Sequence, residues 1–163
     1  MRLFLFLTMI AISVTTRAQS PLTYDSIDFK KIRINGLYFG SKKAELEKRF
    51  GTPQKVVTTE ATKGTDLYSD YYYGKSTLRV SPAGVFNGFK LTEDNFVMGY
   101  GLKLIKPGAS IKEFALNFPA SFKAYAKDTG GKFKLKIRPG NSFIVFKTKN
   151  GIVTEIETWE ETL

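Results

Sequence analysis

The feature that most constrains the fold of this chain is a pattern of glycine, acidic and apolar residues that occurs twice, about 67 residues apart. At an offset of 68, the chain pairs Gly40, Glu45, Leu46 and Phe50 with Gly108, Glu113, Phe114 and Phe118. At offsets of 66 and 67, it pairs Gly74, Ser76, Gly84, Val85 and Phe89 with Gly140, Ser142, Gly151, Ile152 and Ile156. Because the order is the same and the offset nearly constant, the sequence predicts a duplicated unit. A solenoid is not favoured, because its repeats are only ~20–50 residues long.

Each copy begins with an alternating apolar strand that leads into a helix. In the first copy, alternation around Ile32 precedes a helix predicted over 41–50. In the second copy, a strand predicted over 96–104 precedes a helix over 110–118. This second helix starts with a serine and, three residues later, a glutamate, which is the spacing of a capping box. Pro119 is expected to end it.

The segments after each helix alternate with the period of two that is typical of half-buried strands. Strands are predicted over 67–73, 77–81, 85–91, 132–138, 142–148 and 152–159, and loops over 55–66 and 92–95. The sequence therefore predicts an α+β fold. In this fold, two tandem strand–helix–antiparallel-sheet repeats form one sheet, and the helices pack on one face.

The chain begins with a pattern typical of a secretory signal peptide. Arg2 precedes a mostly apolar run over residues 3–14, and small residues lead to a cleavage site predicted after Ala18. An apolar helix of that length is ~18 Å long, too short to cross a hydrocarbon core of ~30 Å. We therefore expect a cleaved signal peptide, no stable membrane anchor, and a periplasmic or secreted bacterial protein. The expected division is 1–18 signal peptide, 19–31 linker, 32–95 first repeat and 96–163 second repeat.

Two missing residue types exclude several chemistries. The chain has no Cys and no His, so it can form no disulfide, no thiolate or imidazole metal site and no Ser-His-Asp triad. Its 25 Lys+Arg and 15 Asp+Glu give a formal net charge of +10. Removing Arg2 and Arg17 with the signal peptide leaves 23 basic and 15 acidic residues, or +8. This charge favours an anionic partner. We expect no catalytic residue, no metal site and no cofactor.

Short motifs in the first repeat resemble the outer-membrane assembly lipoprotein (SmpA/OmlA) family. They are Gly36-Leu37-Tyr38-Phe39-Gly40-Ser41, Leu46, Phe50-Gly51-Thr52-Pro53, Tyr71-Tyr72-Tyr73 and Gly84-Val85. The tandem arrangement over 32–159 is similar to the beta-lactamase inhibitor protein family, in which two such units share one curved sheet. The resemblance implies this fold and an exported binding module, and it carries over no catalytic residue. The chain lacks the lipidated cysteine of the first family and the cysteines of the second, so neither membrane tethering nor a target is implied.

Strand parity predicts a candidate binding surface. If the helices cover one face of the sheet, aromatic and basic side chains gather on the other, and such side chains are enriched in protein interfaces. The candidate binding residues are Tyr68, Tyr72, Arg79, Phe86, Lys134, Lys136, Arg138, Phe143 and Trp159. We expect this face to bind a protein or an anionic envelope component. An ordinary solvated strand face is the alternative interpretation of the same pattern.

The sequence thus favours an exported, non-enzymatic binding module that contacts another envelope or secreted protein. One alternative is an inhibitor or immunity-type protein for a hydrolase or toxin. Another is a cell-wall-polymer hydrolase with a carboxylate pair, either Asp66 and Asp70 or Glu155 and Glu157. Surface salt bridging is the simpler account of the second pair. Nucleic acid is not an expected partner, because no recognised nucleic-acid-binding motif accompanies the charge. The oligomeric state stays open.

Overall fold

The computed structural model of the chain describes residues 23–60 and 67–160, so the predicted signal peptide lies outside the described residues. The first half contains β1 (Ser26–Asp28), the 3-10 helix η1 (Phe29–Lys31), β2 (Ile32–Ile34), β3 (Leu37–Tyr38), α1 (Lys43–Phe50), β4 (Lys55–Glu60), β5 (Leu67–Tyr73), β6 (Ser76–Val80) and β7 (Phe86–Leu91). The second half contains β8 (Met98–Tyr100), β9 (Lys103–Ile105), α2 (Ile111–Ala115), α3 (Pro119–Tyr125), β10 (Lys132–Arg138), β11 (Ser142–Lys149) and β12 (Ile152–Glu160). Within the described ranges, no helix has the length and apolar character needed to cross a membrane.

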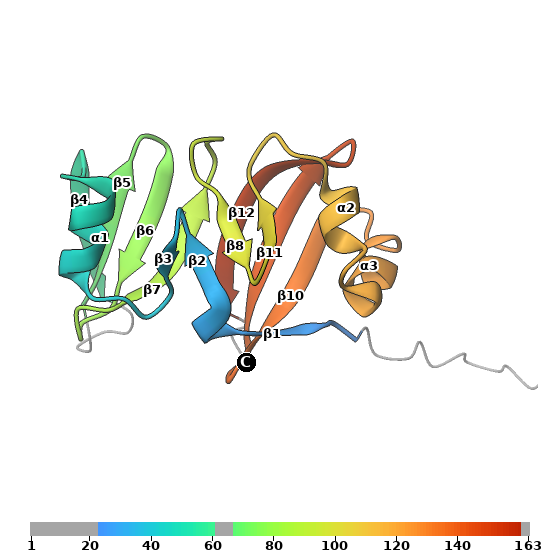
Figure 1. Cartoon of the computed structure of the whole chain (residues 1–163), viewed down its shortest axis with the longest axis horizontal. Helices are drawn as coiled ribbons and strands as arrows, with labels where there is room; N and C mark the ends of the chain where they lie inside the picture. The colour runs from blue at the N-terminus through green and yellow to red at the C-terminus, as the bar shows by residue number, and fades with distance from the viewer. Residues whose placement is uncertain (1–22, 61–66, 161–163) are drawn as a thin grey trace, which may run out of the picture.

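The strands form two sheets, one large and one small. The large sheet has the order β1-β10-β11-β12-β7-β6-β5-β4, and the small one has the order β3-β2-β8-β9. Figure 1 shows α1, α2, α3 and the small sheet on the same side of the large sheet. We call the opposite side of the large sheet the open face. The predicted class of mixed helix and strand is confirmed.

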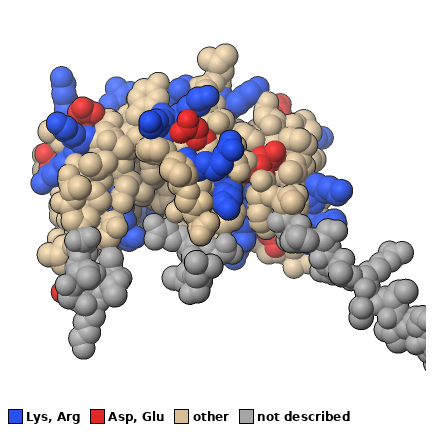
Figure 2. All heavy atoms as spheres, turned by 90° about the horizontal axis from the view of Figure 1, so that it is seen from below, with Lys and Arg blue, Asp and Glu red and all other residues tan. Residues whose placement is uncertain are grey.

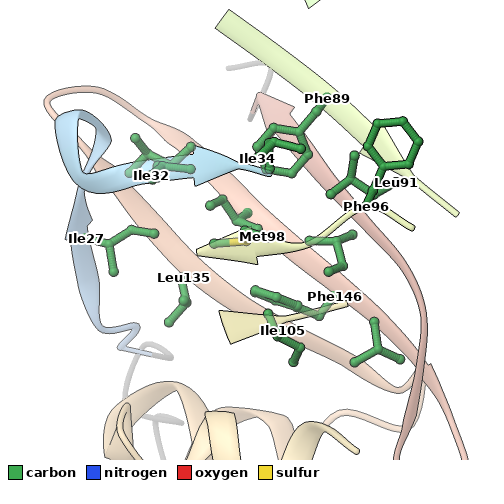
Figure 3. Packing of buried hydrophobic residues seen from close by; sticks show 14 of the residues in the cluster. Ile27, Ile32, Ile34, Phe89, Leu91, Phe96, Met98, Ile105, Leu135 and Phe146 are labelled. Atoms are coloured by element: carbon green, nitrogen blue, oxygen red, sulfur yellow. The ribbon is translucent and has the colours of Figure 1, made fainter. Parts of the chain in front are cut away.

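The hydrophobic core lies between the two sheets. Ile32 of β2 and Met98 of β8 point toward Leu135 and Phe146 of the large sheet (Figure 3), and all four are fully buried. Phe114 of α2 extends this core, with its ring centroid 5.2 Å from that of Phe146. Burial of one such side chain contributes roughly 1.5–3 kcal/mol relative to exposure. The small sheet is therefore held in place mainly by its apolar inner side.

Equivalent backbone hydrogen bonds recur in the two halves at residues 67 or 68 apart. They are Gly40 N to Phe86 O, Lys43 N to Gly84 O and Phe86 N to Ser41 O in the first half, and Gly108 N to Val153 O, Ile111 N to Gly151 O and Val153 N to Ala109 O in the second. In each half they attach the turn before a helix to the start of a long strand, β7 or β12. These two strands are neighbours at the centre of the large sheet.

The prediction of one sheet is wrong, because the strands before each helix form a sheet of their own. β2 pairs with β8, and β3 and β9 flank them as hairpin partners. The predicted single strand over 96–104 is itself a hairpin, which turns at Gly101 with φ 57°. Because these strands are short and apolar on one side, pairing across the halves satisfies their edges while the large sheet covers their inner side.

The helix predicted to end at Pro119 is followed by another. α2 ends at Ala115, and α3 starts with proline at its first position. Proline is tolerated there because the first amides of a helix have no intrahelical acceptor. A cap comes from a distant segment: Ser121 N donates to Asp25 Oδ2 and Asp25 N donates to Ser121 Oγ, each over 2.9 Å.

Two segments predicted to be irregular contain strands. Residues 26–28, within the predicted linker over 19–31, form β1, which pairs in parallel with β10. Residues 55–60, within the predicted loop over 55–66, form β4, which pairs along its length with β5. Both lie at edges of the large sheet. The side chains of an edge strand are less completely buried, so their hydrophobic alternation is weaker in the sequence.

Candidate functional site

A continuous row of directly paired side chains crosses the open face. Its members are Lys134, Val145, Glu157, Lys90, Thr77, Tyr72 and Lys55, one from each of seven strands. Directly opposite residues in antiparallel strands share a face. Lys134 and Tyr72 therefore lie on the same face as predicted, but five strand spacings apart, roughly 24 Å. Candidate residues from the two halves can contact one partner only if that partner spans the sheet.

Aromatic rings and a lysine cluster at the β10–β12 end of the open face. Phe143 pairs directly with Trp159, at 6.2 Å between ring centroids, and with Tyr24 it forms an edge-on contact at 5.5 Å. Lys134 Nζ lies over both outer rings, 5.5 Å from the Trp159 centroid and 5.9 Å from that of Tyr24. We call Tyr24, Lys134, Phe143 and Trp159 the aromatic–lysine cluster. Phe143 is buried in it without belonging to the main core, while Trp159 is 41% exposed.

Three basic side chains line β10 beside this cluster. Lys134, Lys136 and Arg138 alternate along the strand, and Lys136 pairs directly with Phe143. Within the described ranges, none of the three has a carboxylate within salt-bridge distance. Lysine and arginine side chains are scattered over the whole side of the molecule seen in Figure 2. Net charge alone therefore does not single out this strip, whereas its position beside the aromatic rings does.

The centre of the open face is an ion-pair network that satisfies its own charges. Lys147 Nζ lies 2.5 Å from Glu155 Oε1 and 2.8 Å from Glu157 Oε1, and Lys90 Nζ lies 3.1 Å from Glu155 Oε2. Burial alone would raise the pKa of Glu155, but hydrogen bonds from Lys147 and Lys90 outweigh it and lower that pKa. The hydrogen bond to Glu155 raises the pKa of Lys147. A general acid needs a raised pKa, so this carboxylate is poorly suited to that role.

The candidate residues of the first half are engaged locally. Arg79 forms a bidentate pair with Asp70, at 2.7 and 3.0 Å, and its guanidinium lies 6.0 Å from the Tyr68 ring centroid. Lys55 Nζ lies 5.8 Å from the ring centroid of Tyr72. Because the Asp70 carboxylate neutralises Arg79, this half of the face attracts an anionic partner less strongly than the three basic side chains of β10 do.

One candidate residue is on the wrong face. Phe86 is fully buried in the core, with its ring centroid 5.3 Å from that of Phe39. The cause is a register shift between Arg79 and Val80, where the β6–β7 pairing is irregular. A bulge adds one residue to a strand, so the alternation of side chains changes face there. Val153 of β12 is likewise buried in the core, beside a register shift in the β11–β12 pairing.

Sequence reasoning missed Tyr24 because it lies within the predicted linker over 19–31. The alternation of Asp25 and Ile27 with Tyr24, Ser26 and Asp28 was the available pattern, although three paired residues make it short. Within residues 23–60 and 67–160, no group of three or more acidic residues has a geometry suited to a metal ion.

Comparison with known proteins found no matching family model, no similar curated protein and no similar solved structure.

Proposed function

We propose that this protein is an exported, non-enzymatic binding module that contacts an acidic segment of another envelope or secreted protein. The binding site is the β10–β12 end of the open face, made of the aromatic–lysine cluster with Lys136 and Arg138. The observation that carries the proposal is this cluster, in which a buried Phe143 supports an exposed Trp159 beside three basic side chains that have no salt-bridge partner among the described residues. Aromatic anchors flanked by basic groups are typical of interface hot spots.

We also propose that the chain consists of two related units, each a hairpin, a helical segment and antiparallel strands, four in the first unit (β4 to β7) and three in the second (β10 to β12). The equivalent hydrogen bonds at offsets of 67 and 68 support this interpretation. So do the two isolated bridges, Lys42 with Val85 and Ser110 with Ile152, which differ by 68 and 67 residues. Duplication accounts for the fold, and the binding role falls mainly to the second unit.

A crosslinking experiment tests the binding site. A photo-crosslinking amino acid replaces Lys136 on the open face in one variant and Lys48 of α1 on the covered side in another. Each variant is mixed with envelope extract and irradiated. We expect one dominant product from position 136 and none of the same mass from position 48. The same products from both positions would contradict a specific open-face site.

Affinity for the captured partner then separates the site from net charge. The double variant Lys134→Glu/Lys136→Glu is compared with Lys48→Glu/Lys112→Glu, which changes the net charge equally on helical elements. We expect the first to weaken binding at least tenfold, about 1.4 kcal/mol, and the second to change it little. Equal weakening would mean that overall charge, not this surface, attracts the partner.

A further inference from the structure

The two central strands of the large sheet separate soon after they meet. β12 and β7 pair only through Ile156 with Leu91 and Glu157 with Lys90, although both strands continue. Beyond these pairs the side chain of Thr158 replaces the backbone ladder: Phe89 N donates to Thr158 Oγ1 over 3.0 Å. A cleft of about 700 Å³ opens here between the two halves of the sheet. This volume is in the range of ~300–1,000 Å³ typical of small-molecule sites.

The cleft combines aromatic rings with hydrogen-bonding side chains. Tyr68, Trp159 and Phe39 supply rings, and Asn87, Ser142 and Thr158 supply polar groups. The cleft is therefore lined both by flat apolar surfaces and by polar groups. A ligand that fits must present an apolar face and several hydroxyl or amide groups around the same ring.

Asn87 has an unmet hydrogen-bonding need. Its Oδ1 is inaccessible to solvent and has no hydrogen-bond partner among the described residues. A buried acceptor without a donor is costly to the fold, so the site is incomplete as it stands. Because Oδ1 is inaccessible in this conformation, a ligand O–H or N–H donor can reach it only after the Asn87 amide turns toward the cleft, and that contact would relieve the cost.

The charges of the wall argue against an ionic ligand. Arg79 lines the cleft, but its Nε and Nη2 already donate to the two carboxylate oxygens of Asp70. The other charged residue in the wall is Glu60, an exposed carboxylate at the end of β4. A phosphate or carboxylate ligand would meet a neutralised cation and an exposed carboxylate. The wall favours an uncharged ligand.

The strand edges argue against an added peptide strand. Strand addition needs free backbone N–H and C=O groups at the edge. At Phe89 both groups face the Thr158 hydroxyl, at 3.0 Å for the N–H and 3.4 Å for the carbonyl. The hydroxyl therefore occupies the positions that a peptide backbone would use.

We propose that this cleft binds a short neutral oligosaccharide. A pyranose ring has an apolar face of C–H groups that packs on Trp159 or Tyr68. Its hydroxyl and acetamido groups reach Asn87, Ser142 and Thr158. The cleft is too large for one sugar ring to fill it, so two or three linked rings are the expected occupant. This site shares Trp159 with the aromatic–lysine cluster but contains none of the three basic side chains of β10, and it adds a second ligand class to the protein.

The single tryptophan of the chain makes the test direct, because Trp159 lines the cleft. The full chain without its first 18 residues is titrated with chitotriose, cellotriose and maltotriose, and Trp emission and calorimetric heat are recorded. We expect a saturable emission change with at least one of the three, matched by heat with the same midpoint. No response to any of them at 10 mM, or a linear change that never saturates, would overturn the proposal.

The variant Asn87→Leu separates binding from folding. It removes the orphan acceptor at nearly constant volume, so we expect an unfolding temperature equal to or above that of the wild type. We expect sugar affinity to fall at least tenfold. Asn95→Leu makes the same change at an exposed position outside the cleft and should keep wild-type affinity. Unchanged affinity in the folded Asn87→Leu variant would overturn the assignment of the site.

Discussion

At the scale of single residues, the open face contains charged groups in two different states. Glu155 is held by two lysines and lies in a closed network, whereas Lys136 has no described carboxylate within salt-bridge distance. Groups of the first kind stabilise the fold, and groups of the second kind remain available to a partner. Mutations in the two sets should therefore affect different measurements.

The ion-pair network predicts that the stability of the fold decreases at acidic pH. The folded-state pKa of Glu155 lies below its ordinary value of 4.5, so its contribution is present above pH 4.5 and is lost as the pH falls through the folded-state pKa. We expect Glu155→Gln to lower the unfolding temperature at pH 7 and to have much less effect near pH 3. Thermal unfolding across this range is the measurement. Asp94→Asn, an exposed site, is the control, and a pH-independent difference for Glu155→Gln would contradict the network's role.

Tyr73 predicts the alkaline limb. Burial raises its pKa to about 12, and its hydroxyl donates to Gly51 O over 3.1 Å. Folding keeps this hydroxyl protonated. Its contribution to the free energy of unfolding is therefore complete below pH 10 and is lost between pH 10 and about 12. At pH 9, Tyr73→Phe should cost about 0.5–1.5 kcal/mol for the lost hydrogen bond. Urea unfolding at pH 9 and pH 11.5 should show this difference shrinking. A difference that grows with pH would contradict the assignment.

Residue-level predictability stopped at the bulges. Alternation placed Lys134, Lys136, Phe143 and Trp159 correctly on one face, because β10, β11 and the end of β12 pair without interruption there. Phe86 was placed on the wrong face because it lies beside an irregular pairing, and no residue type in the sequence indicates that irregularity. A period-two pattern does not reveal one extra residue in a strand. Beyond that residue, every side chain lies on the face opposite to the predicted one.

At the scale of elements, α3 depends on a segment far away in sequence. Its first turn is capped by the carboxylate of Asp25, whose own amide donates to Ser121 Oγ, and Ser121 is fully buried at this contact. The helix and the start of β1 therefore hold each other in place.

Asp25→Ala tests this dependence. The change leaves the Ser121 amide without its acceptor, so we expect a loss of about 1–2 kcal/mol in the free energy of unfolding. Chemical denaturation followed by circular dichroism measures it. Asp25→Asn retains an acceptor oxygen and should lose less, while Asp94→Ala should be close to neutral. If Asp25→Ala is also neutral, the cap has no energetic role.

The sequence predicted elements well where they are long and poorly where their partners are distant. The helix 41–50 and the strand 132–138 coincide closely with α1 and β10 because each carries its own periodicity. β1 and the break before α3 depend on each other through Asp25 and Ser121, 96 residues apart. Local propensity contains no information about a contact of that separation.

At the scale of the whole molecule, the two halves share one core. The main cluster joins Leu78 of β6 to Phe133 of β10 and to the inner side of the small sheet. Both sheets contain strands from each half. We therefore expect the halves to unfold together.

Leu78→Ala tests this cooperativity. The fully buried leucine lies in the first half, and its truncation should cost about 2–5 kcal/mol. Emission of Trp159, which lies in the second half, and far-UV circular dichroism should shift to the same lower midpoint. Leu102→Ala, at a site 96% exposed, should stay within about 0.5 kcal/mol of the wild type. Two separate transitions would mean that the halves are independent domains.

Because β1 pairs in parallel with β10, the large sheet can form completely only after β10 has been synthesised. The pairing partners of residues 26–28 are residues 136–138, and one of the two partners of β7 is β12, the last strand of the chain. During synthesis, neither sheet can therefore be completed from the amino-terminal hundred residues alone. Contacts of such long range also form slowly. A polypeptide that stays unfinished until its last segment emerges is well suited to threading through a translocation channel before it collapses, as the leader proposed for residues 1–18 requires.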